Sequence, residues 1–173
     1  MTPVTALKIA LGRPLFRMGM VFALLTVVLD QASKMWILHG VRLPQRFQNK
    51  IEISSVFDLT YTENRGISFG LFSGGMTSRV ILSVIAVVIS GFIIRWLTNI
   101  ERPVPAAGAG LILGGAIGNL IDRVAYGYVV DFLDFSGLGF AYIFNVADAA
   151  INVGVALLIL DALVLDRGRG LTD

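Results

Sequence analysis

Two aspartates, Asp131 and Asp148, are the residues of this apolar chain best suited to chemistry. They lie in the runs Gly127-Tyr-Val-Val-Asp131-Phe and Phe144-Asn-Val-Ala-Asp148. An ionisable side chain at membrane depth is costly and is usually kept for function. Two neighbouring carboxylates share a proton, so that one can take a proton from water while the other polarises a carbonyl group. If the fold brings the two together, the predicted chemistry is peptide hydrolysis by activated water.

Other polar residues allow a supporting or a purely structural interpretation. Asn119, Asp122 and Arg123 share one helical face, and they either hold such a dyad in place or form a simple Asp–Arg pair at a helix end. Asp30 and Lys34 are one helical turn apart, which favours a charge-compensated pair inside a membrane helix. Asp148 itself also suits the first turn of a helix, where the helix dipole favours a carboxylate.

Other catalytic classes fit the sequence less well. The G-x-S-x-G pattern of a nucleophile elbow occurs once, at Gly66-Ile-Ser68-Phe-Gly70. That motif needs a large α/β sheet and a histidine partner, and the chain has only one histidine. A Ser33–Lys34 hydrolase is disfavoured because an aspartate one turn away from the lysine keeps it charged. A single histidine and no cysteine exclude zinc motifs, so we expect neither metal nor cofactor.

The composition indicates one integral-membrane domain over residues 1–173. Hydrophobic residues make up 55% of the chain, charged residues only 15%, and the mean hydropathy is +0.78. The net charge of +2 forms no basic stripe, so we expect no nucleic-acid partner.

Four apolar segments predict an all-α bundle of four transmembrane helices. They cover about residues 18–38, 80–97, 103–121 and 143–165, and each is close to the roughly 20 residues needed to span a bilayer. Residues 40–75, between the first two spans, alternate and then become rich in glycine, which predicts a small extramembrane β element. Gly110, Gly114 and Gly118 are four apart, which is typical of close helix packing.

The predicted topology gathers the polar residues at one end of the bundle. Seven Lys and Arg residues fall on each side of the predicted membrane, so the full count does not decide the orientation. Without Lys34, Arg65 and Arg123, which lie in polar motifs, the count favours two cytoplasmic termini. The polar residues then face the outer side, and Asp131 lies in the loop before the last span. A proton-coupled transporter is the alternative, although transporters usually place such residues near the midplane and often contain a repeat.

Five stretches together make the chain similar to one known family. They are Asp30 to Lys34, Asn64 to Gly70, Gly114 to Arg123, Gly127 to Phe132, and Phe144 to Ile151. In this order, in a chain of this length with four spans, they resemble bacterial lipoprotein signal peptidase (signal peptidase II). Ile67 is bulkier than the small residues usual for the family at this place. The chain lacks the Gly-x-Gly-Asp run of presenilin-like and prepilin-type aspartic proteases.

The resemblance implies an aspartic endopeptidase of the bacterial inner membrane. It would cut diacylglyceryl-modified prolipoproteins on the amino side of the lipidated cysteine, near the outer face, with membrane lipid around it and as a monomer. The family's catalytic residues correspond to Asp131 and Asp148. Its supporting residues correspond to Asp30, Lys34, Asn64, Gly66, Asn119, Asp122, Arg123 and Asn145.

Overall fold

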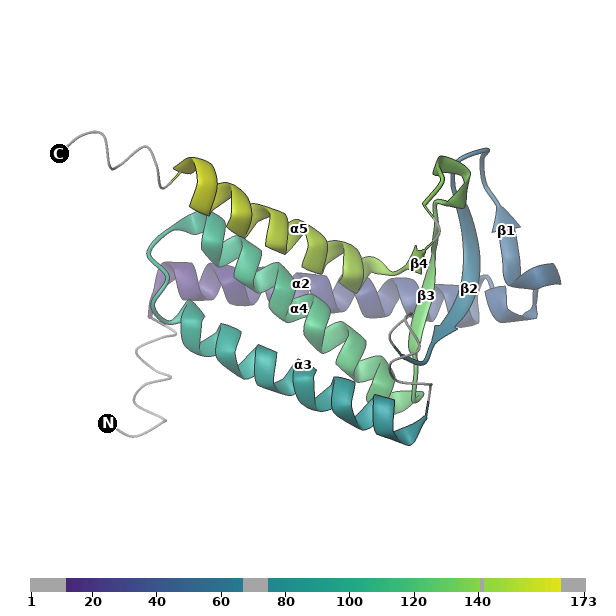
Figure 1. Cartoon of the computed structure of the whole chain (residues 1–173), viewed down its shortest axis with the longest axis horizontal. Helices are drawn as coiled ribbons and strands as arrows, with labels where there is room; N and C mark the ends of the chain where they lie inside the picture. Colours follow the sequence, from purple (N-terminus) through teal and green to yellow (C-terminus); the bar gives the residue numbers. More distant parts are fainter. Residues whose placement is uncertain (1–11, 67–74, 141, 166–173) are drawn as a thin grey trace.

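The computed structural model describes residues 12–66, 75–140 and 142–165. In this part of the chain, four helices are long and apolar enough to cross a membrane. They are α2 (Pro14–Met35), α3 (Met76–Leu97), α4 (Pro103–Ala125) and α5 (Val146–Leu160). Figure 1 shows the helices side by side, with a sheet across one end and with the start of α2 and the end of α5 at the other. The predicted four-helix architecture is confirmed.

The helix starts follow from local sequence. Pro14 and Pro103 occupy the first turns of α2 and α4, where a missing backbone N–H is harmless and the fixed φ suits a helix. Asn145 caps α5 with its side chain. The shorter helical segments are η1 (Trp36–Gly40), η2 (Leu43–Gln45), η3 (Phe47–Asn49), η4 (Ser136–Leu138) and η5 (Asp161–Leu165).

Helix α4 is the centre of the bundle and contacts α2, α3 and α5. The predicted glycine row explains the close approach to α2. A Cβ on Gly114 would lie 2.5 Å from the Ala23 carbonyl oxygen, and one on Gly118 would lie 2.6 Å from the Asp30 carboxylate. On the α5 side, a Cβ on Gly108 would lie 2.9 Å from the backbone oxygen of Gly154. Glycine is therefore needed on two faces of α4, as close helix packing in membranes requires.

A four-stranded antiparallel sheet has the order β1-β2-β3-β4. Its strands are β1 (Lys50–Glu52), β2 (Asp58–Asn64), β3 (Val129–Asp134) and β4 (Ile143–Phe144). A small core of buried apolar side chains joins the sheet to the end of α2, with Ile37, Leu43 and Val130 fully buried. The sheet therefore sits on the helix ends and can position polar groups there.

Two expectations about this region were wrong. The β element is not confined to residues 40–75, because β3 and β4 come from the connection between α4 and α5. Asp131 accordingly lies in a strand and not in a loop, and residues 143 and 144 form a strand before α5 begins at Val146. The predicted combination of four membrane-spanning helices with a small β element is confirmed, and the difference lies in which segments supply the strands. Of the predicted Gly-rich turn, residues 67–74, including Ser68 and Gly70, lie outside the described residues.

The packing predicts that Gly114→Ala destabilises the protein by about 1–3 kcal/mol, because even one methyl group meets the α2 backbone. Gly91 in α3 is the matched control, since a Cβ there would meet nothing within 4 Å. Thermal unfolding in detergent should show a lower midpoint for Gly114→Ala and no loss for Gly91→Ala. Equal midpoints for the two variants would contradict this packing.

Candidate active site

Asp131 lies within β3 and its side chain is only 2% exposed. Its carboxylate accepts hydrogen bonds from Asn145 Nδ2 at 2.6 Å and from Asn64 Nδ2 at 3.0 Å. Burial, and then the nearby charge of Asp148, raise the pKa of Asp131 to about 7, although the two amides and Lys34 act in the opposite direction. A carboxyl group with this pKa can both hold and release a proton near neutral pH.

A shift in the β2–β3 pairing decides which side chain of β2 reaches Asp131. Thr62 pairs with Asp131, in a register one residue away from the register at Leu59. Side chains two apart in a strand share a face, so Asn64 lies on the Asp131 side. In the unshifted register Glu63 would take that place. The β-bulge therefore puts an amide donor beside Asp131 where a regular ladder would put a second carboxylate.

Asp148 occupies the third position of α5, in the turn where the helix dipole favours negative charge. Its carboxylate accepts a hydrogen bond from Asn119 Nδ2 at 2.8 Å and one from the backbone N–H of Asn145 at 3.4 Å. The second bond belongs to a capping box, since Asn145 Oδ1 accepts from the Asp148 N–H at 2.9 Å. Asp148 is therefore a carboxylate at a helix terminus, as the structural interpretation of the sequence predicted.

Asn145 is the side chain that joins the two aspartates. It is fully buried, and its Nδ2 donates to Asp131 at 2.6 Å and to Asn119 Oδ1 at 3.1 Å. Its Oδ1 meanwhile caps the turn that carries Asp148. Asp131 and Asp148, from a strand and from a helix, are thus brought together through one shared amide, and the charge of Asp148 acts on Asp131.

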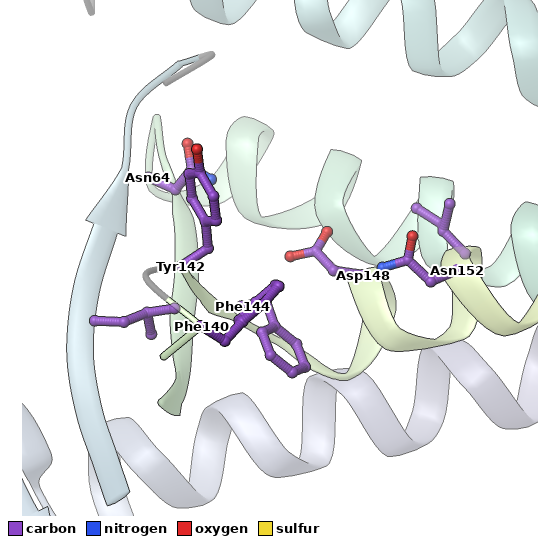
Figure 2. A pocket seen from close by; sticks show the side chains of 8 residues that line it. Asn64, Phe140, Tyr142, Phe144, Asp148 and Asn152 are labelled. Atoms are coloured by element: carbon purple, nitrogen blue, oxygen red, sulfur yellow. The ribbon is translucent and has the colours of Figure 1, made fainter. Parts of the chain in front are cut away.

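A pocket of about 380 Å³ opens beside Asp148. Its wall is mostly aromatic and aliphatic, with Asn64, Phe140, Tyr142, Ile143, Phe144, Asp148, Ile151 and Asn152. In Figure 2 the Asp148 carboxylate points into the space beside Tyr142 and Phe144, with Asn64 on the far side. Asp131 is not among the lining residues and is connected to the wall by its hydrogen bond with Asn64. The arrangement offers a ligand one half-buried carboxylate in the pocket wall and one buried carboxylate beyond it.

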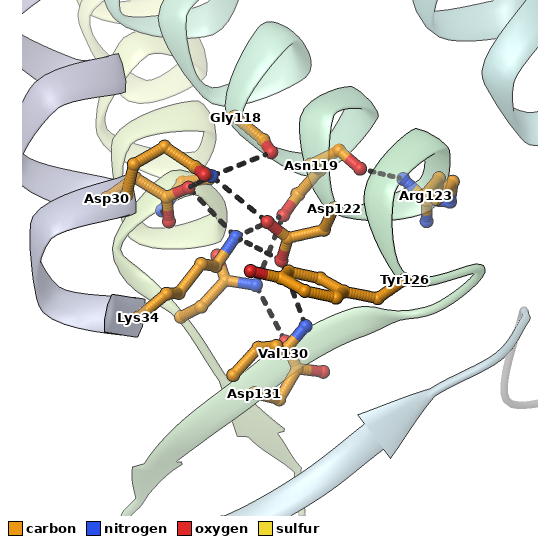
Figure 3. Close-up of polar contacts among 12 residues, drawn as sticks. Asp30, Lys34, Gly118, Asn119, Asp122, Arg123, Tyr126, Val130 and Asp131 are labelled. Atoms are coloured by element: carbon orange, nitrogen blue, oxygen red, sulfur yellow. Dashed lines mark hydrogen bonds and ion pairs between the residues drawn. The ribbon is translucent and has the colours of Figure 1, made fainter. Parts of the chain in front are cut away.

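A buried charged cluster of Lys34, Asp30 and Asp122 lies next to Asp131 (Figure 3). Lys34 Nζ lies 2.8 Å from a carboxylate oxygen of each aspartate. The predicted Asp30–Lys34 pair is confirmed. The Ser33–Lys34 alternative loses its geometric basis, because Ser33 Oγ donates to the Asp30 carbonyl oxygen at 2.7 Å.

The other predicted site residues are Asp122, Arg123 and Gly66, and the first two do not pair with each other. Asp122 pairs with Lys34 and not with its neighbour Arg123, which donates to the Asn119 carbonyl oxygen at 3.4 Å. The simple Asp–Arg pair at the helix end is therefore not formed. The Gly66 N–H donates to Asn64 Oδ1 at 3.2 Å and so orients the amide that contacts Asp131.

Gln31 is a site residue that the sequence reasoning missed. Its Nε2 lies within hydrogen-bond distance of Asp30 at 3.1 Å, Asp122 at 3.0 Å and the Gly118 carbonyl oxygen at 3.2 Å. The available signal was its place between Asp30 and Lys34 in a polar stretch of a membrane helix. In the part of the chain that the structure describes, no group of three His, Cys, Asp or Glu side chains is arranged to hold a metal ion.

Comparison with known protein sequences points to one family. The model of the signal peptidase (SPase) II family matches residues 22–164. A lipoprotein signal peptidase of Caulobacter vibrioides is 45% identical over 148 residues, which cover 85% of this chain and 87% of that protein. One from Sphingopyxis alaskensis is 40% identical over 163 residues and covers 92% of this chain and 93% of its own.

Two solved structures of bacterial membrane enzymes have a similar fold. The one determined by the in meso method at 1.9 Å resolution has a TM-score of 0.73 and 27% identity, covering 84% of this chain and 92% of its own. The one at 2.3 Å has a TM-score of 0.72 and 28% identity, covering 86% and 88%. The family match covers α3, α4, α5, most of α2 and both aspartates, and the chain therefore belongs to the signal peptidase II family.

Proposed function

We propose that this membrane peptidase is an aspartic endopeptidase that uses Asp131 and Asp148 as its catalytic pair. Its substrates are diacylglyceryl-modified prolipoproteins, which it cuts on the amino side of the lipidated cysteine. The observation that carries the proposal is the connection of the two aspartates through Asn145 beside an open pocket. The relatives named lipoprotein signal peptidase support the substrate class.

The two carboxyl groups have different environments, which supports different roles. Asp131 is buried, and its pKa of about 7 lets it carry the shared proton near neutral pH. Asp148 lines the pocket and has the access that a water-activating base needs. Pairs of titratable groups in unlike environments divide acid and base roles in this way.

The proposed reaction needs only these two groups and water. Asp148 takes a proton from water as the oxygen attacks the scissile carbonyl carbon, and Asp131 gives its proton to the carbonyl oxygen. The tetrahedral diol then collapses: the carbon–nitrogen bond breaks, the proton on Asp148 goes to the leaving amine, and Asp131 recovers its proton. Both carboxyl groups return to their starting states.

The wall of the pocket suits an extended, apolar signal peptide. Phe140, Tyr142 and Phe144 supply flat apolar contacts, and Ile151 continues the wall down α5 toward the bilayer. The lipid of the substrate would remain between helices and membrane while the scissile bond reaches Asp148. The edge of the sheet can bind an extended peptide through backbone hydrogen bonds.

The proposed orientation has both termini in the cytoplasm and the sheet on the outer face of the inner membrane. The site then faces the side on which lipidated precursors emerge. Its polar network lies at one end of the bundle, beside the sheet, and not midway along the helices as a transporter relay would. We propose that the protein acts as a monomer, since one copy of the chain is enough to connect Asp131 and Asp148 through Asn145.

The first prediction concerns the catalytic pair. Asp131→Asn and Asp148→Asn should each abolish cleavage of a purified diacylglyceryl-modified prolipoprotein, because neither amide can exchange the required proton. Both variants should keep the thermal unfolding midpoint of the parent within a few degrees. Normal turnover by either variant would remove the proposed mechanism.

The second prediction concerns pH. A raised pKa of Asp131 means that its proton is present below pH 7 and lost above it, so activity should fall as pH rises through about 7. Asn64→Ala removes a donor that favours ionised Asp131, so the alkaline limb should move to higher pH. Asn152→Ala is the control, because Asn152 lines the same pocket but is not a donor to Asp131. A limb that moves equally in both variants, or in neither, would contradict this role.

The third prediction concerns orientation, and the natural absence of cysteine makes it simple to test. Phe47 is 86% exposed beside the sheet, and Asn99 is exposed in the α3–α4 connection at the opposite end. In intact spheroplasts a membrane-impermeant maleimide should label Phe47→Cys, and should label Asn99→Cys only after permeabilisation. The reverse pattern would place the dyad on the cytoplasmic side.

A further inference from the structure

The Lys34 ammonium group makes contacts with three different side chains, although only 2% of the residue is exposed. It lies 2.8 Å from Asp30 Oδ2, 2.8 Å from Asp122 Oδ2 and 3.3 Å from Asn119 Oδ1. An ammonium group has three donors, and here each has an acceptor. Figure 3 shows Lys34 between the two aspartates, with Asn119 above and β3 below.

Asp30 connects Lys34 to the backbone next to Asp148. While its Oδ2 binds the ammonium group, its Oδ1 accepts a hydrogen bond from the Ala147 N–H at 2.9 Å. Ala147 lies in the first turn of α5, where backbone N–H groups have no partner within the helix. A side chain of α2 thus caps α5 one residue before Asp148.

Asp122 makes the corresponding connection to the other aspartate. Its Oδ2 accepts a hydrogen bond from the Val130 N–H at 3.0 Å while it binds Lys34. Val130 directly precedes Asp131 in β3. The two carboxylates that neutralise Lys34 therefore each hold the backbone N–H immediately before one member of the proposed dyad.

A third connection reaches a side chain of the dyad directly. Asn119 Oδ1 accepts from Lys34 and from Asn145 Nδ2, at 3.3 Å and 3.1 Å. Two donors on the oxygen side leave the Asn119 amide nitrogen facing Asp148, to which it donates at 2.8 Å. Lys34 thereby fixes which end of the Asn119 amide meets Asp148.

We propose that Lys34 is a positioning residue that sets the relative placement of Asp131 and Asp148 through Asp30, Asp122 and Asn119. The inference rests on the proposed function of these two aspartates and adds a role for a group that does not touch them. Loss of the ammonium group would leave two buried carboxylates unpaired, and they would move apart or bind other donors. Both backbone connections and the Asn119 amide would then shift together.

Another ion pair of the chain, with a buried carboxylate and a partly exposed arginine, provides the comparison for a purely structural role. Arg102 and Asp161 are 2.7 Å apart at the end of the bundle remote from the sheet, and the Asp161 side chain is 5% exposed. Asp161 belongs to η5, at the far end of α5 from the turn that carries Asp148. Breaking it should reduce stability without changing the chemistry of the site.

The experiment uses the full-length protein in detergent and a diacylglyceryl-modified prolipoprotein as substrate. Lys34→Met keeps the length of the side chain and removes its charge. Because a misplacement of about 1 Å can cost on the order of 10²-fold, kcat should fall by about that factor while KM changes less than threefold. Asp161→Asn should lower the unfolding midpoint and leave kcat unchanged.

The pH profile gives a readout that loss of stability alone would not move. The charged groups that act on Asp131 are Asp148 from α5, Lys34 from α2 and Arg123 from α4. The positive charge of Lys34 lowers the pKa of Asp131, so Lys34→Met should move the alkaline limb to higher pH. Asp161→Asn should keep the limb of the parent.

Two milder variants decide the question if Lys34→Met does not fold. Asp30→Asn and Asp122→Asn each keep an oxygen for the backbone N–H but lose the ion pair, and each should lower kcat about tenfold at unchanged KM. Folded Lys34→Met, or both Asn variants, with the kcat and alkaline limb of the parent would overturn the proposal. If that result came with an active parent and an inactive Asp131→Asn variant, only the positioning role of Lys34 would have failed, and the proposed function would stand. A folded parent that does not cleave would instead refute the proposed function.

Discussion

The buried ammonium group of Lys34 is the interaction on which the geometry of this end of the molecule depends. Charged groups inside a membrane protein are stable only when they are paired and hydrogen-bonded. Here the pairing joins α2 to α4 through Asp122, and the same carboxylates extend it to the backbone of α5 and β3. One requirement, neutralisation of a buried charge, thus fixes the relative positions of four elements.

The close packing of α4 makes this cluster possible. Gly118 has no side chain, so the Asp30 carboxylate can lie against α4 where a Cβ would be 2.6 Å from its oxygen. The Gly118 carbonyl oxygen, Asp30 and Asp122 are then all within hydrogen-bond distance of the Gln31 amide nitrogen. Small residues in α4 therefore serve the polar site as well as helix association, and the two functions meet at the end of the bundle beside the sheet.

Much of this arrangement could be predicted from the sequence, because it depends on local patterns. The apolar lengths predicted the helices, and the i to i+4 spacing predicted the Asp30–Lys34 pair. The site of Asp131 could not be predicted in the same way. Its strand is short, and its pairing partner in β2 lies about seventy positions away and is shifted by a bulge. Long-range pairing and a one-residue register shift leave no periodic signal in a single sequence.

In the proposed reaction the two aspartates activate water directly, and no covalent intermediate forms. The most direct measurement is a single turnover in H₂¹⁸O with enzyme in excess over a diacylglyceryl-modified prolipoprotein, followed by mass spectrometry of both products and of the enzyme. Direct attack by water predicts one ¹⁸O atom in the new carboxyl terminus of the released signal peptide and none in the enzyme. An unlabelled signal peptide together with ¹⁸O in the peptide containing Asp131 or Asp148 would instead show a covalent acyl-aspartyl intermediate and rule out direct attack by water.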